Sequence, residues 1–560
     1  MPMTGPRLIV PVMLALLAGC ASAPPTTQFR GKDLDAARVA DWKSTALMGG
    51  PLRPAQAAYD VQHYDLRIAV YPEDKRVEGS NAVTVAVVAP LDVFEIPLDS
   101  RLTVRSVSLD GIALRGFVHA GGLLRVALDA PWLPGEEHVV SIAYGGRPFE
   151  ALAPPWMDGF VWSRSADGRP WFGTTSQGSG GDLWWPVKDH PSDEPDRGMR
   201  ITLDVPAGLV GLANGRRLAE RTEAGRNITE WAVSYPINQY GVAVNGGPFV
   251  PVETHYTRLD GKVETIVFWA LPEHADQARR MWLDQGPRIL SAFAAKFGEY
   301  PYWNDKYWVV ETPYLGMEHQ TIVAYGSKFE VDEFGMDWLL LHETAHEWWG
   351  NKLSAADWAD WWLHEGFGAY AHGVFVDVDA GRERYLEYMR KRCNAEAFGK
   401  YRNPVIRGTD QVAETAYVPE VYSKASCMLH SLRWLMGDER FYEVLYRFLN
   451  DARFAHRSAA SAGFGRRVAG GSGSPQDWFF DRYLYDTRIP RWRMERTPDG
   501  DADLLAFSWD DPVFQLPIPV RAGTELHRVA MKGGSGRLRV PRGAEVSVDP
   551  DGWLLALPER

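Results

Sequence analysis

Residues 337–368 read DWLLLHETAHEWWGNKLSAADWADWWLHEGFG and contain two histidines four positions apart, His342 and His346. On a helix, side chains at i and i+4 lie on one face, one turn apart, so both imidazoles can point at a single metal ion. Glu365 follows after 18 intervening residues. A hydrolytic zinc site needs three protein ligands and one open position for water. We therefore expect one zinc ion per chain, bound by His342, His346 and Glu365.

Glu343 directly follows the first histidine, so it is offset around the helix. Its carboxylate can reach a metal-activated water without occupying a ligand position, which is the role of the general base in HExxH metallopeptidases. The leucines at 339–341 give the helix an apolar entry, and Gly350-Asn351 is an ending signal. The pattern predicts metal-assisted hydrolysis. It does not distinguish an exopeptidase from an endopeptidase.

The segments HETAHEWWGN (342–351) and WLHEGFGAY (362–370) resemble the gluzincin zinc aminopeptidases, the family that includes aminopeptidase N and the leukotriene hydrolase. His364 stands where that family usually has asparagine. The resemblance implies a thermolysin-like, helix-rich zinc domain. It also implies an enzyme that removes amino-terminal residues from peptides, so we expect peptides with a free amino terminus as substrates.

A second segment, LGMEH at 315–319, resembles the G-x-M-E-N signature of the same family, with His319 in place of asparagine. By this resemblance, Gly316, Met317 and Glu318 bind the substrate. The Glu318 carboxylate is expected to hold the free α-amino group, since a carboxylate pairs well with a cationic amine. The choice of an aminopeptidase over an endopeptidase depends on this residue.

Two further site residues follow from the same resemblance. The segment EVYSKA at 420–425 resembles the family segment with a catalytic tyrosine, so Tyr422 is expected to donate a hydrogen bond to the oxyanion. Ala425 stands where glycine is common. In the family a glutamine just before a segment like WPVKDHP (185–191) reaches the active site from the amino-terminal domain. Gln177 is our candidate, the alternative being a loop glutamine without a ligand.

The whole chain is expected to be an α+β multidomain protein, because 560 residues exceed what one core usually serves. Residues 51–250 show period-two alternation and regularly spaced turns, which predict an antiparallel β-sandwich. Helical spacing over 251–490 indicates the zinc peptidase domain. Residues 491–560 are interpreted as a small β-domain. Within the central part, GFGRRVAGGSGS (463–474) is expected to be a flexible loop.

The amino terminus resembles a bacterial lipoprotein leader. Residues 1–20 combine a basic start with a short apolar run, typical of an export signal, and they end in LAGC like a lipobox. Cys20 would then be lipidated, with residues 21–50 as a tether, giving a lipoprotein anchored in the outer membrane and facing the periplasm. The alternative is an ordinary signal cleaved nearby, for example after Ala23.

Cys393 and Cys427 can form a disulfide in an oxidising compartment, or remain free buried thiols. The net charge of −12 and the lack of a basic patch argue against a nucleic-acid partner. Besides an aminopeptidase, two interpretations remain: a zinc hydrolase of other specificity, such as an endopeptidase, and a non-catalytic peptide-binding lipoprotein. A purely structural zinc site would be closed by a fourth protein ligand, which the sequence does not show.

Overall fold

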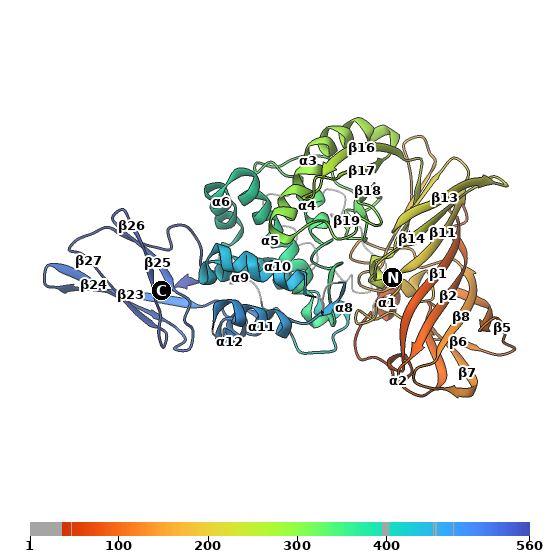
Figure 1. Ribbon diagram of the computed structural model, residues 1–560, viewed down its shortest axis with the longest axis horizontal. Helices are drawn as coiled ribbons and strands as arrows, with labels where there is room; N and C mark the ends of the chain where they lie inside the picture. Colours follow the sequence, from red (N-terminus) through yellow and green to blue (C-terminus); the bar gives the residue numbers. More distant parts are fainter. Residues whose placement is uncertain are drawn as a thin grey trace, which may run out of the picture.

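The computed structural model describes residues 36–45, 48–394, 402–451, 453, 456–473 and 475–559. A β-rich amino-terminal domain lies at one end of the elongated molecule, and a smaller β-domain lies at the other (Figure 1). Between them is a central domain built of helices around one five-stranded sheet. The predicted α+β multidomain fold is confirmed.

The amino-terminal domain is built on an eight-stranded sheet in the order β13-β14-β11-β1-β2-β8-β4-β5. In β1 and β2, side chains alternate between buried and less buried, because successive residues of a strand point to opposite faces. Two smaller sheets, β12-β15-β10-β9 and β3-β7-β6, complete the domain. The strands are β1 (Tyr59–Tyr71), β2 (Arg76–Val87), β3 (Leu91–Pro97), β4 (Leu102–Leu109), β5 (Ile112–Ala113), β6 (Val118–Ala120), β7 (Leu123–Trp132), β8 (Glu137–Gly146), β9 (Gly159–Arg164), β10 (Pro170–Thr175), β11 (Met199–Pro206), β12 (Val210–Ala213), β13 (Arg216–Glu223), β14 (Arg226–Val233) and β15 (Val244–Gly247).

The central domain begins with a sheet in the order β16-β17-β18-β20-β19, which leaves the short strand β19 at the edge. Its strands are β16 (Val250–Thr257), β17 (Val263–Ala270), β18 (Trp308–Glu311), β19 (Gly316–Met317) and β20 (Ile322–Tyr325). Its helices are α3 (Ala275–Phe297), α4 (Trp338–Ala345), α5 (Trp362–Ala380), α6 (Arg382–Arg392), α8 (Ala413–Ala416), α9 (Ser423–Met436), α10 (Asp438–Leu449), α11 (Ser461–Ser472) and α12 (Asp477–Phe480), and a short pair joins β21 (Leu353–Ala355) to β22 (Arg457–Ala459). The edge position of β19 places the LGMEH segment beside α4.

The carboxyl-terminal domain has two small sheets, β27-β24-β23-β29 and β26-β25-β28. It is docked on α9, where Ser431 Oγ donates to the carbonyl of Trp553 at 2.9 Å. Its buried side chains belong to the same continuous core as those of the central domain. The strands are β23 (Arg491–Asp499), β24 (Ala502–Trp509), β25 (Ile518–Ala522), β26 (Glu525–Val529), β27 (Ser535–Pro541), β28 (Val546–Val548) and β29 (Leu557–Pro558).

Part of the predicted tether is folded, which corrects the expectation for residues 21–50. Helix α1 (Ala36–Thr45) carries Trp42, which is 3% exposed and donates from Nε1 to Asp158 at 3.2 Å. Met48 is 1% exposed, and its carbonyl accepts from the backbone N–H of Ala413. Burial of these two apolar side chains stabilises a folded conformation of the segment, although its local composition favours an extended linker. A further short helix, α2 (Pro54–Ala57), precedes β1.

The predicted leader and its lipidation site, Cys20, fall within residues 1–35, which lie outside the residues that the structure describes. Within the part that is described, no helix combines the length and the apolar character that crossing a bilayer requires.

The glycine-rich segment 463–474 is also different from the prediction. Most of it is helix α11, whose residues Phe464 and Val468 are fully buried. Phe464 packs against Phe367 of α5 with ring centroids 5.3 Å apart. Glycine lowers helix propensity by only about 1 kcal/mol per residue, so a buried apolar stripe on one face can hold such a sequence helical.

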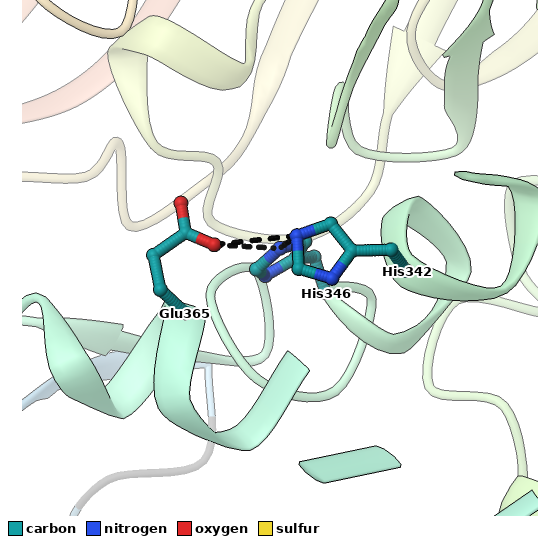
Figure 2. Close-up of side chains that lie close together, drawn as sticks. All are labelled: His342, His346 and Glu365. Carbon is teal, nitrogen blue, oxygen red and sulfur yellow. Dashed lines mark hydrogen bonds and ion pairs between the residues drawn. The ribbon is translucent and has the colours of Figure 1, made fainter. Parts of the chain in front are cut away.

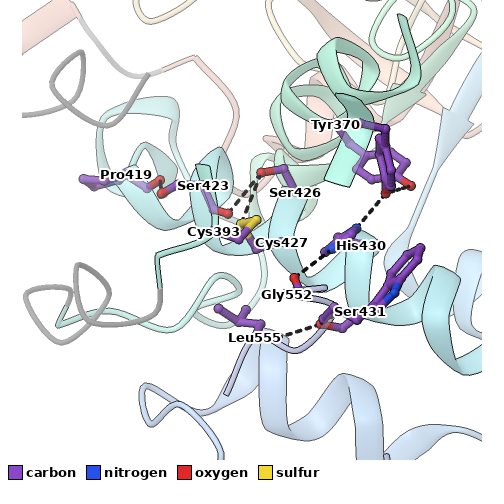
Figure 3. The surroundings of a disulfide bond; sticks show 12 residues. Tyr370, Cys393, Pro419, Ser423, Ser426, Cys427, His430, Ser431, Gly552 and Leu555 are labelled. Atoms are coloured by element: carbon purple, nitrogen blue, oxygen red, sulfur yellow. Dashed lines mark hydrogen bonds between the residues drawn. A yellow bond between two sulfur atoms is a disulfide. The ribbon is translucent and has the colours of Figure 1, made fainter. Parts of the chain in front are cut away.

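Cys393 and Cys427 form a disulfide (Figure 3). Cys393 caps the carboxyl end of α6, and Cys427 lies in the first half of α9. In the same part of α9, the backbone N–H of Ser426 donates to the carbonyl of Tyr422 at 3.0 Å. The disulfide therefore ties the carboxyl end of α6 to α9, the helix that follows Tyr422.

The contact between the amino-terminal and central domains gives a pH-dependent prediction. Glu194 is 8% exposed and accepts a hydrogen bond from Ser354 Oγ at 2.5 Å. Burial raises the pKa of Glu194 from 4.5 to about 7, although the Ser354 hydrogen bond acts in the opposite direction. Between these values the folded state keeps a proton that the unfolded state has lost, so this group's contribution to the unfolding free energy falls as pH rises.

We expect Glu194→Gln to gain stability relative to the wild type as pH rises from 5 to 8, by about 3 kcal/mol at most. Glutamine can still accept from Ser354, and it has no proton to lose. Apparent melting temperatures measured at several pH values test this. The matched control is Glu253→Gln, which changes an exposed glutamate of β16. An identical pH dependence in both variants would contradict the prediction.

Candidate metal centre and substrate cavity

His342, His346 and Glu365 converge on one point, as predicted (Figure 2). The carboxylate oxygen Oε2 of Glu365 lies 3.3 Å from Nε2 of His342 and 3.4 Å from Nε2 of His346. The two Nε2 atoms are 3.3 Å apart. The histidines come from α4 and from its carboxyl-terminal cap, while Glu365 lies in the first turn of α5.

This arrangement fits a zinc ion. Zinc forms bonds of about 2.0–2.2 Å to imidazole nitrogen and carboxylate oxygen, and tetrahedral angles then separate the donor atoms by about 3.3–3.5 Å. The three observed separations have these values. In addition, Oε2 of Glu365 is buried and has no hydrogen-bond partner among the described residues. A cation at this point would satisfy that oxygen and both imidazole nitrogens.

The protein orients both imidazoles through their second nitrogens. Nδ1 of His346 donates to the carbonyl of Trp349 at 2.8 Å, which leaves Nε2 as the ligand atom. Nδ1 of His342 lies 3.4 Å from Nε2 of His372, which is 4% exposed. His372 was not among the residues predicted from the sequence. The available signal was its position seven residues after Glu365, two helical turns along the same face of α5.

Helix α4 is short, and its start is fixed by Asp337. The Asp337 side chain accepts from the backbone N–H of Leu340 at 3.0 Å, which is the usual amino-terminal cap. The same carboxylate accepts from the hydroxyl of Tyr325 at 2.5 Å. Because Tyr325 belongs to β20, the cap fixes the metal helix relative to the sheet.

His364 stands where the gluzincin family usually has asparagine. It does not face the metal point, which is the place where His342, His346 and Glu365 converge. Its Nε2 accepts from the backbone N–H of Ala355 at 2.7 Å, and its Nδ1 lies 3.3 Å from the hydroxyl of Tyr240. Burial lowers the pKa of His364 to about 3, so the imidazole stays neutral. His319 is fully buried and is not among the residues that line the cavity. Both substitutions therefore lie outside the space open to a substrate.

Glu343 lies beside the metal point without being part of the ligand triangle. Burial, and next the Glu318 carboxylate, raise the pKa of Glu343 well above its ordinary value. Gly316 lies directly against it, because a side-chain carbon at position 316 would come within 2.6 Å of Glu343 Oε1. Gly316 thus leaves the space in which the Glu343 carboxylate sits. Met317 is 2% exposed and also lines the cavity.

Glu318 and Gln177 meet across the domain boundary. Nε2 of Gln177 donates to Oε1 of Glu318 at 2.6 Å, although the residues are 141 positions apart in the sequence. Asn351 donates to the Glu318 carbonyl at 2.9 Å and so fixes the backbone there. Burial raises the pKa of Glu318 to about 7, against the opposing effect of His346. The amino-terminal domain therefore contributes Gln177 to the site, and its Pro155 and Trp156 also line the cavity.

Tyr422 completes the cavity at the start of α9. Its ring lies 6.1 Å from that of His342, centroid to centroid. Its hydroxyl is 3.0 Å from the hydroxyl of Tyr417, a residue that was not predicted from the sequence. A single cavity is lined by all the predicted site residues other than Cys20, and also by His372, Tyr417 and Arg392.

Comparisons with known proteins agree with this geometry. Residues 282–483 match the Peptidase family M1 domain. Among curated proteins, aminopeptidase B of Mus musculus is 22% identical over 352 residues, which are 60% of this chain and 51% of that protein. Aminopeptidase N of Streptomyces lividans is 24% identical over 393 residues, 64% of this chain and 44% of that protein. The chain thus spans about half the length of these curated relatives.

Solved structures show the same fold. An M1 zinc metallopeptidase of Deinococcus radiodurans, in a mutant form bound to a Tyr-Ser-Ala substrate, matches with a TM-score of 0.65 and 22% identity. The match covers 76% of this chain and 94% of that one. Another structure of the metallopeptidase from this organism gives a TM-score of 0.64 at the same identity. Together with the converging ligands, the family match identifies residues 282–483 as a peptidase family M1 domain, the domain of the gluzincin zinc metallopeptidases.

Proposed function

We propose that this chain is a zinc aminopeptidase that removes one residue at a time from the free amino terminus of peptides. One observation carries the proposal: a carboxylate oxygen of Glu318, one of Glu343 and a ring nitrogen of His346 all lie within 4.8 Å of one another. In a peptide, a single Cα separates the free amine from the first carbonyl. A site for the amine this close to the general base and a metal ligand leaves room for only one residue before the scissile bond.

Selection of a free amine follows from charge. The α-ammonium can approach the Glu318 carboxylate, one oxygen of which already accepts from Gln177. An acetylated amine carries no charge and would leave this buried carboxylate without a cation. Leaving a buried polar partner unpaired costs about 1–3 kcal/mol, and more for a charged group. Blocked peptides are therefore poor substrates in this proposal.

His342, His346 and Glu365 would hold the zinc ion, which, when bound, acidifies water and polarises the scissile carbonyl. Glu343 accepts the proton of the attacking water and returns it to the leaving amine. Tyr422 donates its phenol hydrogen bond where negative charge develops on the carbonyl oxygen. The hydroxyl of Tyr417, 3.0 Å away, orients the Tyr422 hydroxyl.

The place of action is part of the same proposal. The LAGC motif at residues 17–20 supports lipidation of Cys20 and anchoring in the bacterial outer membrane. The enzyme would then cleave peptides in the periplasm, and the folded body would need no spanning helix.

The first test concerns the metal. We expect the purified protein to contain about one zinc ion per chain by elemental analysis, because the three donors satisfy the needs of zinc. Glu365→Gln should reduce that content at least tenfold. Glu318→Gln is the matched control, since Glu318 belongs to a second acidic group around His346 that could also hold a cation. Loss of zinc in Glu318→Gln, with retention of zinc in Glu365→Gln, would show that the metal is held at the second group, and this result would overturn the proposal.

The second test separates an aminopeptidase from the two alternatives. We expect hydrolysis of aminoacyl anilides with a free amine, at least a hundredfold slower hydrolysis of their N-acetyl counterparts, and loss of activity with a chelator. Glu343→Gln and Tyr422→Phe should each lower kcat by about 10²–10³-fold with zinc retained, because each removes a group that acts in the transition state. Glu318→Gln should instead mainly raise KM for free-amine substrates.

Comparable cleavage of free and blocked substrates would identify an endopeptidase instead. Zinc binding without turnover, and with no effect of Glu343→Gln, would identify a peptide-binding protein.

The third test concerns the anchor. In a Gram-negative host, we expect the wild type in the membrane fraction and Cys20→Ser in the soluble periplasmic fraction, with incorporation of labelled palmitate only in the wild type. Ala23→Ser is the control, since a change at that position leaves the lipobox cysteine intact. Equal distribution of the wild type and Cys20→Ser would indicate an ordinary cleaved signal.

A further inference from the structure

Gln177 is carried by a glycine-rich loop that needs support from the rest of the protein. The loop follows β10 and has glycine at positions 178, 180 and 181. Glycine loses more conformational freedom on folding than any other residue, so holding such a loop in one conformation costs more backbone entropy. The position of the Gln177 side chain, which donates to Glu318 at 2.6 Å, therefore depends on what holds the loop.

The Asp158 carboxylate holds this loop. Its Oδ2 accepts from the backbone N–H groups of Gly178 at 2.6 Å and of Ser179 at 3.0 Å, and its Oδ1 accepts from the Ser179 hydroxyl at 2.6 Å. Asp158 is fully buried and directly precedes β9, the strand that pairs with β10. The carboxylate is thus attached to the sheet and binds the two residues that follow Gln177.

Trp42 of α1 adds a further donor to this carboxylate. Its Nε1 donates to Oδ1 of Asp158 at 3.2 Å, and the side chain is 3% exposed. A side-chain carbon at Gly178 would lie 3.7 Å from Cζ2 of Trp42, so the indole packs against the loop at the residue next to Gln177. A buried carboxylate that loses a donor is strongly penalised. Removal of the indole N–H would therefore loosen the carboxylate and the loop that it binds.

The other end of the same segment contacts the central domain. Residues 36–45 and 48–50 are hereafter the amino-terminal segment. The carbonyl of Met48 accepts from the backbone N–H of Ala413 at 3.0 Å. Both residues belong to one apolar cluster, and Tyr417 of the substrate cavity packs against that cluster. The amino-terminal segment therefore contacts both domains beside the cavity, and α1 lies at the junction of the two domains (Figure 1).

We propose that Trp42 is a positioning residue for amine recognition, because it fixes, through Asp158, the loop that places Gln177 against Glu318. The inference rests on the proposed aminopeptidase function and deepens it, since it assigns part of the support of the amine site to the amino-terminal segment. Gln177 limits rotation of the Glu318 carboxylate by binding one of its oxygens. A loosened loop would widen the range of Glu318 orientations, so binding of the α-ammonium would weaken. The metal ligands and Glu343 would stay in place.

The first test separates substrate binding from turnover. Trp42→Phe keeps an aromatic ring in the core and removes the indole N–H. With a leucine anilide that has a free amine, we expect KM to rise by about five- to twentyfold while kcat stays within about twofold of the wild type. Ser179→Ala removes another hydrogen bond to Asp158 and should raise KM in the same direction by a smaller factor.

Trp509→Phe is the matched control. Trp509 is a buried residue of the carboxyl-terminal domain, and its indole donates to the carbonyl of Leu516 at 3.0 Å. This variant loses a comparable hydrogen bond in another domain, so KM should keep the wild-type value whatever the change in melting temperature. An equal rise of KM in Trp42→Phe and Trp509→Phe would indicate general damage to the fold and would overturn the inference.

A double-mutant cycle tests the route through Gln177. In the zinc-loaded Glu343→Gln background, calorimetry gives the Kd of the peptide Leu-Ala-Ala without turnover. Trp42→Phe should raise this Kd by about fivefold or more when Gln177 is present. It should raise the Kd by less than about twofold when Gln177→Ala is also present, because residues that act through one contact are not additive. An equal effect in both backgrounds would mean that Trp42 does not act through Gln177, which contradicts the inference.

Hydrogen exchange separates this inference from the proposed function, because it needs no substrate. The amides of Gly178 and Ser179 should exchange about tenfold faster in Trp42→Phe than in the wild type or in Trp509→Phe. If the wild type cleaves free-amine substrates and Trp42→Phe changes neither KM nor exchange, the proposed function stands and the role of Trp42 is wrong. If the wild type cleaves no free-amine peptide, the proposed function fails, and exchange alone decides whether Trp42 fixes the loop.

Discussion

The triangle of His342, His346 and Glu365 is the constraint on which the rest of the molecule depends, because three electron-rich atoms are held 3.3–3.4 Å apart. Without a cation such an arrangement is unfavourable, so the surrounding structure must hold it in place. The carbonyl of Trp349 and the ring of His372 orient the imidazoles from behind. Gly368 of α5 lies below both rings, since a side-chain carbon there would come within 2.9 Å of His346 Cε1. Helix α5 can therefore pack close to the metal helix.

The centre is assembled from parts that lie far apart in the chain. Glu343, His342 and His346 come from α4 or its cap, Glu318 directly follows the edge strand β19, and Gln177 comes from the amino-terminal domain. The interface that brings Gln177 to Glu318 is itself held by buried polar contacts, such as Ser354 with Glu194. Two polar contacts, Gln177 with Glu318 and Ser354 with Glu194, therefore cross the boundary between the two domains.

Much of the site could be predicted from the sequence, because most of its residues lie within short motifs whose members are close together along the chain. An i, i+4 histidine pair and a glutamate on the next helix constrain one another, and short motifs located Glu318 and Tyr422. Tyr417 and Arg392 were not predicted, since nothing in their immediate neighbours indicates chemistry, and His372 was not predicted although its position seven residues after Glu365 was an available signal. The expectations for residues 21–50 and 463–474 failed for a related reason. Local composition indicated flexibility, whereas Trp42 and Phe464 are buried against segments more than 90 residues away.

The sequence by itself determined the fold class and the convergence of His342, His346 and Glu365, because helical periodicity and strand alternation are properties of neighbouring residues. Only the tertiary structure decided that Gln177 meets Glu318, that Cys393 is bonded to Cys427, and that His372 lies beside the second nitrogen of His342. Those facts depend on how helices and sheets pack against one another. Packing is set by complementary surfaces that are formed from distant parts of the chain, and no local pattern records them.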